Sequence, residues 1–295
     1  MQLFYQLYIS ESCRIRKIRY NLFMPDKNIE ILSVKTADFE MPYAKIGNGP
    51  KTFVIIPGLN VKNLMPAAPA VATQYSRFLD DYTIYLFERV TNPPENYGIS
   101  DMTRDAATAF DTLKIRDAYI MGTSLGGTTA LKLCAERGDF VKKLIVCGAA
   151  SKTSEKAQKI FEEWIKFADG ENKNVNALNL SFAKNVYSPA FYKKFEKQII
   201  SSMEGATDDE LKRFVIFART LLHLDIVSEL KNISVPVLAA GSEGDAVFGG
   251  NATLEIQKAI GKNCKTFLFE EYGHAFYDET PEFLDLLWSF FESGE

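Results

Sequence analysis

Residues 118–127 read AYIMGTSLGG and join an apolar run to the pattern G-x-S-x-G. The run at 118–121 suits a buried strand, and residues 128–137 behind the pattern follow helical spacing. A strand, a sharp turn and a helix around this pattern are the setting of a nucleophile elbow, with Ser124 on a strained turn. Gly122 and Gly126 are needed because a side chain at either position would clash with nearby backbone. Ser124 is therefore the candidate nucleophile; the alternative is a glycine-rich turn without chemistry.

Further short apolar runs lie on both sides of this turn. They occupy residues 53–56, 83–87, 144–147, 235–240 and 265–269, and residues 29–34 alternate like a half-buried edge strand. Helical patterns lie between the runs, one behind Ser100 as its N-cap, and the last behind Thr280 as N-cap with Pro281 at the first helical position. Continuous apolar runs suit strands that are covered on both faces. The alternation predicts an α/β fold with a mainly parallel sheet.

Residues 151–222 interrupt this alternation with helical patterns alone. One apolar stripe spans residues 157–168, Ser188-Pro189 starts a second helix, and Thr207 with Glu210 forms a capping box for a third. A block of roughly 70 residues is longer than ordinary connections between strands. We therefore predict a helical cap over the edge of the sheet; the alternative is a plain helical layer on one face.

A serine hydroxyl needs a neighbouring base to act as a nucleophile near neutral pH. The chain has only two histidines, His223 and His274. His274 follows the last predicted strand directly, and the carboxyl ends of parallel strands are where open α/β sheets carry functional groups. His223 lies in the apolar segment LLHL and is interpreted as a packed, structural histidine. His274 is the predicted base.

The base in turn needs an acid that fixes its tautomer. Asp245 lies in the turn after the strand predicted at 235–240, and Glu243 in the same turn is its close rival. Asp225 and Glu270 are weaker candidates. The order serine, aspartate, histidine along the chain is the order of α/β-hydrolases and differs from the orders of two protease folds.

A tetrahedral intermediate also needs hydrogen-bond donors for its oxygen. The N–H group of Leu125, just after the nucleophile, is one candidate. The N–H group of Leu59 is the other, because it follows Pro57-Gly58 at the end of the strand predicted at 53–56, and Gly58 allows close approach of the backbone.

These motifs together resemble the α/β-hydrolase superfamily, in its capped branch that is esterase-like or carbon–carbon-bond-hydrolase-like. The resemblance covers residues 29–295 and rests on GTSLGG at 122–127, PGLN at 57–60, Gly244-Asp245 and Gly273-His274. It implies an eight-stranded sheet, a cap between the sixth and seventh strands, and no metal or organic cofactor. It divides the chain into an N-terminal extension (1–28), a core (29–150 and 223–295) and a helical cap (151–222). Many relatives carry histidine where this chain has Pro57.

Composition limits the remaining possibilities. The chain has 295 residues and a net charge of -4, and it contains no dense basic stretch, which argues against a nucleic-acid partner. No apolar run approaches the ~18–20 residues of a membrane-spanning helix. The first eight residues are largely apolar and aromatic, and Arg14, Arg16, Lys17 and Arg19 follow them. A secretory signal has the opposite order, with its basic residues first. We interpret this segment as a plain extension or as sequence before a later start at Met24; the alternative is a helix that lies on a membrane surface. The four cysteines form no C-x-x-C pair, so we expect no metal site and a cytoplasmic location.

The sequence thus predicts a serine hydrolase whose partner is a small-molecule substrate. Ser124 is the expected nucleophile, His274 the base and Asp245 the acid. Aromatic residues in the predicted cap, Phe161, Trp164 and Phe191 among them, favour a small, fairly apolar ester or related acyl compound. Two alternatives stay open: a C–C bond hydrolase of diketone-type substrates, and a non-catalytic sensor of small molecules on the same fold.

Overall fold

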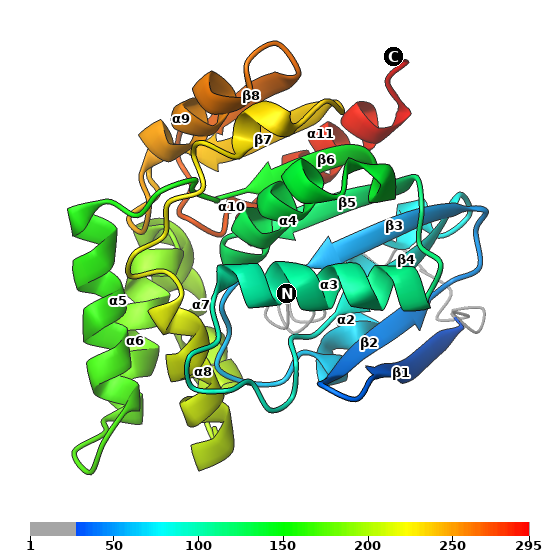
Figure 1. Cartoon of the computed structure of the whole chain (residues 1–295). Helices are drawn as coiled ribbons and strands as arrows, with labels where there is room; N and C mark the ends of the chain where they lie inside the picture. The colour runs from blue at the N-terminus through cyan, green and yellow to red at the C-terminus, as the bar shows by residue number, and fades with distance from the viewer. Residues whose placement is uncertain (1–27, 295) are drawn as a thin grey trace, which may run out of the picture.

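An eight-stranded sheet runs through the computed structural model, which describes residues 28–294 (Figure 1). The strands follow the order β1-β2-β4-β3-β5-β6-β7-β8. Their bounds are β1 Ile29–Lys35, β2 Glu40–Ile46, β3 Lys51–Ile56, β4 Tyr82–Phe87, β5 Ala118–Thr123, β6 Val141–Cys147, β7 Val237–Ser242 and β8 Cys264–Phe269. All pairs from β4 to β8 are parallel, whereas β2 is antiparallel to both β1 and β4. The predicted α/β fold with a mainly parallel sheet is confirmed.

Strand β2 is the one strand that no apolar run in the sequence predicts. It reads EMPYAKI, in which Pro42 and two charged residues dilute the apolar signal. Pro42 has no N–H to donate to the ladder, but its carbonyl oxygen accepts the N–H of Glu88 at 2.8 Å. Buried side chains at Met41, Tyr43 and Ile46 attach the strand to the core.

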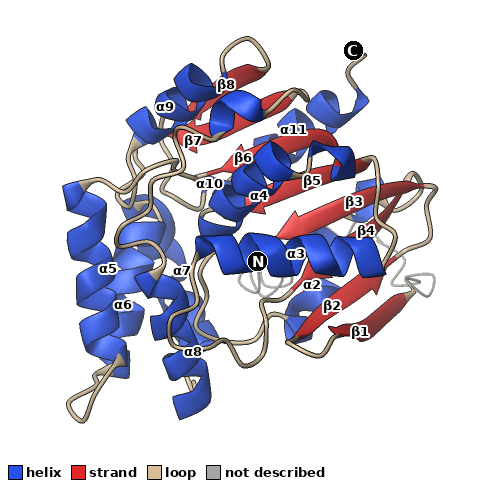
Figure 2. Cartoon of the chain, viewed as in Figure 1, coloured by secondary structure: helices blue, strands red, loops and turns tan. Residues whose placement is uncertain are grey.

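Helices cover both faces of the sheet (Figure 2). Helices α3 (Ile99–Thr112), α4 (Leu125–Glu136) and α9 (Gly250–Ile260) contribute to one hydrophobic core; α2 (Ala68–Gln74), α10 (Phe276–Glu279) and α11 (Glu282–Glu292) contribute to the other. Strand β5 serves both cores, because its consecutive residues Ile120 and Met121 point to opposite faces. Burial on both faces explains the continuous apolar runs of the central strands.

Two predicted helix starts are wrong by one or two positions. Helix α3 begins at Ile99, and its N-cap is Gly98 rather than Ser100. Gly98 is held because the Asp101 carboxylate accepts its N–H at 2.9 Å. Helix α11 begins at Glu282, so Pro281 stands before the first helical residue, while the Thr280 hydroxyl still accepts the N–H of Glu282 at 3.3 Å.

Four helices separate β6 from β7, and we refer to them as the helical insertion. They are α5 (Glu155–Ala168), α6 (Val175–Val186), α7 (Pro189–Met203) and α8 (Asp208–Arg219). The hydroxyl of Ser188 caps α7 by accepting the N–H of Phe191 at 3.2 Å, and Thr207 with Glu210 forms the predicted capping box of α8. In Figure 1 the four helices stand together at the end toward which the arrow of β3 points. The helical insertion therefore lies near the carboxyl ends of the parallel strands.

The predicted N-terminal extension, residues 1–28, lies outside the described residues except for Asn28. Within the described chain, no helix is both long and apolar enough to cross a membrane. The thiols of Cys134, Cys147 and Cys264 are free and buried, and burial raises the pKa of each. These cysteines fill space as small apolar side chains.

Candidate active site

Ser124 occupies a tight turn between β5 and α4, with φ 50° and ψ -123°. A positive φ is unfavourable for a residue with a side chain and persists only where the surroundings enforce it. Here the N–H of Ser124 donates to the carbonyl of Cys147 at 2.8 Å, and its carbonyl accepts the N–H of Thr128 at 3.0 Å. The turn thus has the strained geometry predicted from G-x-S-x-G.

The glycines beside Ser124 are required by close backbone contacts. A Cβ at Gly126 would lie 2.2 Å from the carbonyl oxygen of Ile56 and 2.3 Å from that of Pro57. A Cβ at Gly122 would lie 2.7 Å from the carbonyl oxygen of Gly126. The two glycines therefore allow α4 to pack closely against the ends of β3 and β5.

The Gly126→Ala variant should be less stable by at least about 2 kcal/mol, because the contacted atoms are backbone and move only with their strands. The matched control is Gly138→Ala, since a Cβ there would meet nothing within 4 Å. Urea unfolding of both variants measures the difference. Equal stability of the two would contradict the close contact.

His274 and Asp245 form a buried pair at the carboxyl ends of neighbouring strands. The Nδ1 atom of His274 lies 2.9 Å from Oδ2 of Asp245. The other carboxylate oxygen accepts the N–H groups of Val247 at 2.8 Å and Phe248 at 3.0 Å. Both side chains of the pair are 4% exposed, so the interaction is shielded from water. The carboxylate is thereby fixed by its own turn and orients the imidazole.

The rival acids lie elsewhere. Glu243 and Glu270 are exposed, and Asp225 pairs with Lys152 at 2.9 Å. The interpretation of His223 as a packed histidine is wrong: its side chain is exposed in the turn after α8, while its neighbours Leu221 and Leu224 are buried. The segment LLHL thus buries Leu221 and Leu224 and leaves His223 exposed to solvent.

The pKa of Asp245 lies below that of an ordinary aspartate. Burial works against this by raising the pKa, but the charge and hydrogen bond of His274 and the two backbone N–H donors outweigh it. Ionised Asp245 therefore stabilises the fold at pH values above the pKa it has in the unfolded chain, about 3.9. This contribution is lost as the pH falls through that value toward the lower pKa of the folded state.

The stability gap between the wild type and Asp245→Asn should therefore be largest near neutral pH and shrink between about pH 5 and pH 3. Urea unfolding across that range measures it. A gap that stays constant with pH would contradict the lowered pKa.

Ser124 and His274 both line one cavity of about 160 Å³. Phe161 and Trp164 of α5 and Phe182 of α6 line it from the helical insertion. Phe191 is not among its lining residues; its ring packs between those of Tyr187 and Phe195, at 5.3 and 4.7 Å. The cavity thus lies between the sheet and the helical insertion.

The two predicted oxyanion donors are the N–H groups of Leu125 and Leu59. Leu125 is the first residue of α4, a position whose N–H has no partner within the helix. Leu59 lines the cavity, and the preceding N–H, that of Gly58, donates to the Thr123 hydroxyl at 2.8 Å. The carbonyls of Pro57 and Gly58 accept hydrogen bonds from Arg89, a buried residue that no motif in the sequence marks. No group of three or more possible metal ligands occurs within residues 28–294.

Comparisons with known proteins agree with this architecture. The family model described as alpha/beta hydrolase fold matches residues 74–281. "Putative carbamate hydrolase RutD" of Caulobacter sp. (strain K31) is 23% identical over 263 residues, covering 86% of this chain and 96% of that protein. 3-Oxoadipate enol-lactonase 1 of Acinetobacter baylyi is 24% identical over 208 residues, covering 68% and 73%. MGS-M2, an alpha/beta hydrolase enzyme from a deep-sea metagenome library, superimposes with a TM-score of 0.79 at 21% identity, covering 90% and 98%.

Proposed function

This chain belongs to the alpha/beta hydrolase family, and from that premise we propose that it is a serine hydrolase that cleaves small, fairly apolar esters through an acyl-enzyme. The observation that supports the proposal most is the 2.9 Å contact between Nδ1 of His274 and Asp245, with His274 and Ser124 on the wall of one cavity. A base oriented by a buried acid beside a strained serine is the arrangement that acyl transfer needs.

In the first half of the reaction, Oγ of Ser124 attacks the acyl carbon and its proton passes to Nε2 of His274. The electron pair of the carbonyl bond moves to the oxygen, where the N–H groups of Leu59 and Leu125 stabilise the negative charge. Asp245 keeps the proton on Nδ1 and stabilises the imidazolium. When the intermediate collapses, the bond to the alcohol breaks, the alcohol takes the proton from Nε2, and Ser124 is left acylated.

The second half repeats these steps with water. His274 takes a proton from the water molecule as its oxygen attacks the acyl carbon, and the same two N–H groups hold the oxyanion. Collapse breaks the bond to Ser124, whose Oγ recovers the proton from Nε2. The carboxylic acid leaves and the free enzyme is restored.

The cavity supports a small acyl group. Its volume of about 160 Å³ is close to that of cavities that hold one benzene-sized molecule, ~150 Å³. Phe161, Trp164 and Phe182 give it an aromatic wall. We propose that the helical insertion acts as a cap that closes over this group. One relative is named for a lactone, which is a cyclic ester, and another for a carbamate; both contain an acyl carbon bonded to oxygen or nitrogen.

Turnover of p-nitrophenyl acetate, butyrate and decanoate tests the proposal. We expect activity on the two short esters, and kcat/KM at least about tenfold lower for decanoate, because its chain exceeds the cavity and loses contacts worth more than 1.4 kcal/mol. A parallel panel holds a lactone, a carbamate and a vinylogous diketone. Preference for the diketone would replace ester cleavage by C–C bond cleavage, and a folded protein that turns over none of these compounds would favour a sensor.

A further inference from the structure

A single buried guanidinium holds the loop that carries Leu59. Arg89, which follows the end of β4, donates from Nη2 to the carbonyl of Pro57 at 2.8 Å and also to that of Gly58. Its Nη1 donates to the side-chain oxygen of Asn60. Arg89 is 7% exposed, and although it binds three residues of the cavity wall it does not itself line the cavity. It therefore acts on the loop from the side opposite the cavity.

The hydrogen bond from Arg89 to the Gly58 carbonyl also determines the direction of the Leu59 N–H. In a planar trans peptide the C=O of one residue and the N–H of the next point in opposite directions. The carbonyl of Gly58 points to Arg89, so the N–H of Leu59 points away from it. Gly58 itself packs against the nucleophile turn, since a Cβ on it would lie 3.0 Å from Cβ of Ser124, and we infer that the Leu59 N–H faces this turn. Within residues 28–294 no acceptor takes the Leu59 N–H, which leaves this donor available to a ligand.

The guanidinium keeps its charge in this site. Burial lowers the pKa of Arg89 to about 10, and the Glu88 carboxylate opposes the shift. Glu88 is fully buried; its Oε1 accepts the N–H of Arg89 at 2.8 Å and lies 3.9 Å from Nη1. The ring of Phe217 on α8 lies 5.2 Å from the guanidinium. The planar, charged guanidinium can thus donate to the Pro57 carbonyl, the Gly58 carbonyl and the Asn60 side chain at once.

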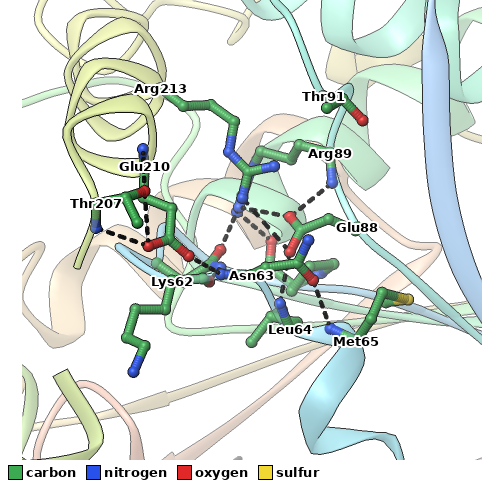
Figure 3. Close-up of polar contacts among 12 residues, drawn as sticks. Lys62, Asn63, Leu64, Met65, Glu88, Arg89, Thr91, Thr207, Glu210 and Arg213 are labelled. Atoms are coloured by element: carbon green, nitrogen blue, oxygen red, sulfur yellow. Dashed lines mark hydrogen bonds and ion pairs between the residues drawn. The ribbon is translucent and has the colours of Figure 1, made fainter. Parts of the chain in front are cut away.

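The buried polar contacts of Arg89 and Glu88 extend to the helical insertion, as Figure 3 shows. Oε2 of Glu88 accepts the N–H of Leu64 at 2.7 Å and lies 3.7 Å from Nη2 of Arg213 on α8. Oε1 of Glu210, also on α8, accepts the N–H of Asn63 at 3.1 Å. Residues 57–64 are therefore fixed at one end by Arg89 and at the other by α8.

We propose that Arg89 is the positioning residue of the oxyanion hole: by binding the carbonyls of Pro57 and Gly58 it aims the N–H of Leu59 at the acyl oxygen, and α8 supports the same loop through Glu210. This inference rests on the proposed serine-hydrolase function. It assigns a role to a side chain that never touches the substrate. The competing explanation is that Arg89 only stabilises the fold.

Kinetics of Arg89→Met and Arg89→Lys with p-nitrophenyl acetate separate the two explanations. Loss of one oxyanion donor lowers kcat by about 100-fold or more. We expect Arg89→Met to lose about this much, with KM changed by less than about threefold because ground-state binding does not use the donor. Arg89→Lys keeps the charge beside Glu88 but lacks the fork, so it should fall between Arg89→Met and the wild type.

Inhibitor binding supplies a readout that fold stability does not move. A trifluoromethyl ketone forms an adduct with the serine whose oxyanion occupies the hole. Its inhibition constant should rise across the variants in proportion to the fall in kcat/KM. Active-site titration corrects each rate for the fraction of folded enzyme.

The matched control is Lys143→Met. Lys143 is another buried cation that binds backbone carbonyls, those of Phe290 and Phe291 at 3.0 and 3.2 Å, at the C-terminal end of α11. It should lose stability and keep kcat within about twofold per active site. A second comparison uses Glu210→Ala and Thr207→Ala. Both break the capping box of α8, but only Glu210→Ala releases Asn63, so only it should lower kcat, by about three- to tenfold.

Each outcome decides the proposal. Arg89 variants with normal kcat per active site and unchanged inhibitor binding overturn it while leaving the hydrolase function intact. A wild type that turns over no ester and whose Ser124 resists a fluorophosphonate refutes the hydrolase function, and the inference falls with it. A fall in kcat matched by weaker inhibitor binding, in variants whose control retains activity, supports it.

Discussion

The Ser124→Ala variant is expected to lower kcat for p-nitrophenyl acetate by about 10⁶-fold, with little change in stability. The nucleophile forms the bond on which every later step depends, so its removal leaves only the background that binding and oxyanion stabilisation provide. Stability should change little because alanine keeps the Cβ and the backbone contacts that hold the strained turn. Stopped-flow and long-time assays on protein of verified melting temperature measure the effect.

Ser151→Ala is the matched control. Ser151 is also buried, follows β6, and lies outside the cavity lining; its hydroxyl has no hydrogen-bond partner among the described residues. We expect its kcat to stay within about twofold of the wild type. Substantial turnover by Ser124→Ala would remove Ser124 from the mechanism.

The His274→Gln variant should lose about as much activity as Ser124→Ala, again about 10⁶-fold in kcat. Without the imidazole, the hydroxyl proton has no acceptor and the alcohol no donor. Because the two residues act as one unit, the double variant should be no slower than either single variant. Steady-state rates of the three proteins on the same ester give the comparison.

His223→Gln provides the control, because it removes the only other histidine of the chain from an exposed position. It should leave kcat within about twofold of the wild type. Losses that add up in the double variant would show that Ser124 and His274 do not act together.

The elbow could be predicted from sequence because its geometry is local. Steric clashes at Gly122 and Gly126 follow from which residues lack a side chain, and the strand and helix around Ser124 are visible as patterns. The same holds for His274 and Asp245, which follow apolar strands that end at one edge of the sheet. Parallel topology then brings residues about 120 to 150 positions apart together.

Other features depend on contacts that no local pattern contains. Strand β2 is stabilised by pairing on both sides, which overrides its weak propensity and its proline. The N-cap of α3 is Gly98 and not Ser100. The Asp101 carboxylate accepts the N–H of Gly98, so the helix start is fixed without a serine side chain at the N-cap. His223 looked buried because its neighbours are buried.

The ion cluster around Arg89 was beyond sequence reasoning for the same reason. Glu88 and Arg89 follow an apolar strand, where charged residues ordinarily mark the return to solvent. Their burial becomes apparent only once the loop at 57–64 and helix α8 lie over them.

Labelling with a fluorophosphonate, followed by mass spectrometry of the modified peptide, tests whether residues 124, 245 and 274 form one catalytic unit. The reagent reacts with a serine only where a base activates it and an oxyanion hole receives its oxygen. We predict one adduct per chain, on Ser124, that is lost in His274→Gln and slowed in Asp245→Asn. An unlabelled, folded wild type, or equal labelling of Ser124 in the absence of the His274 imidazole, would contradict the account.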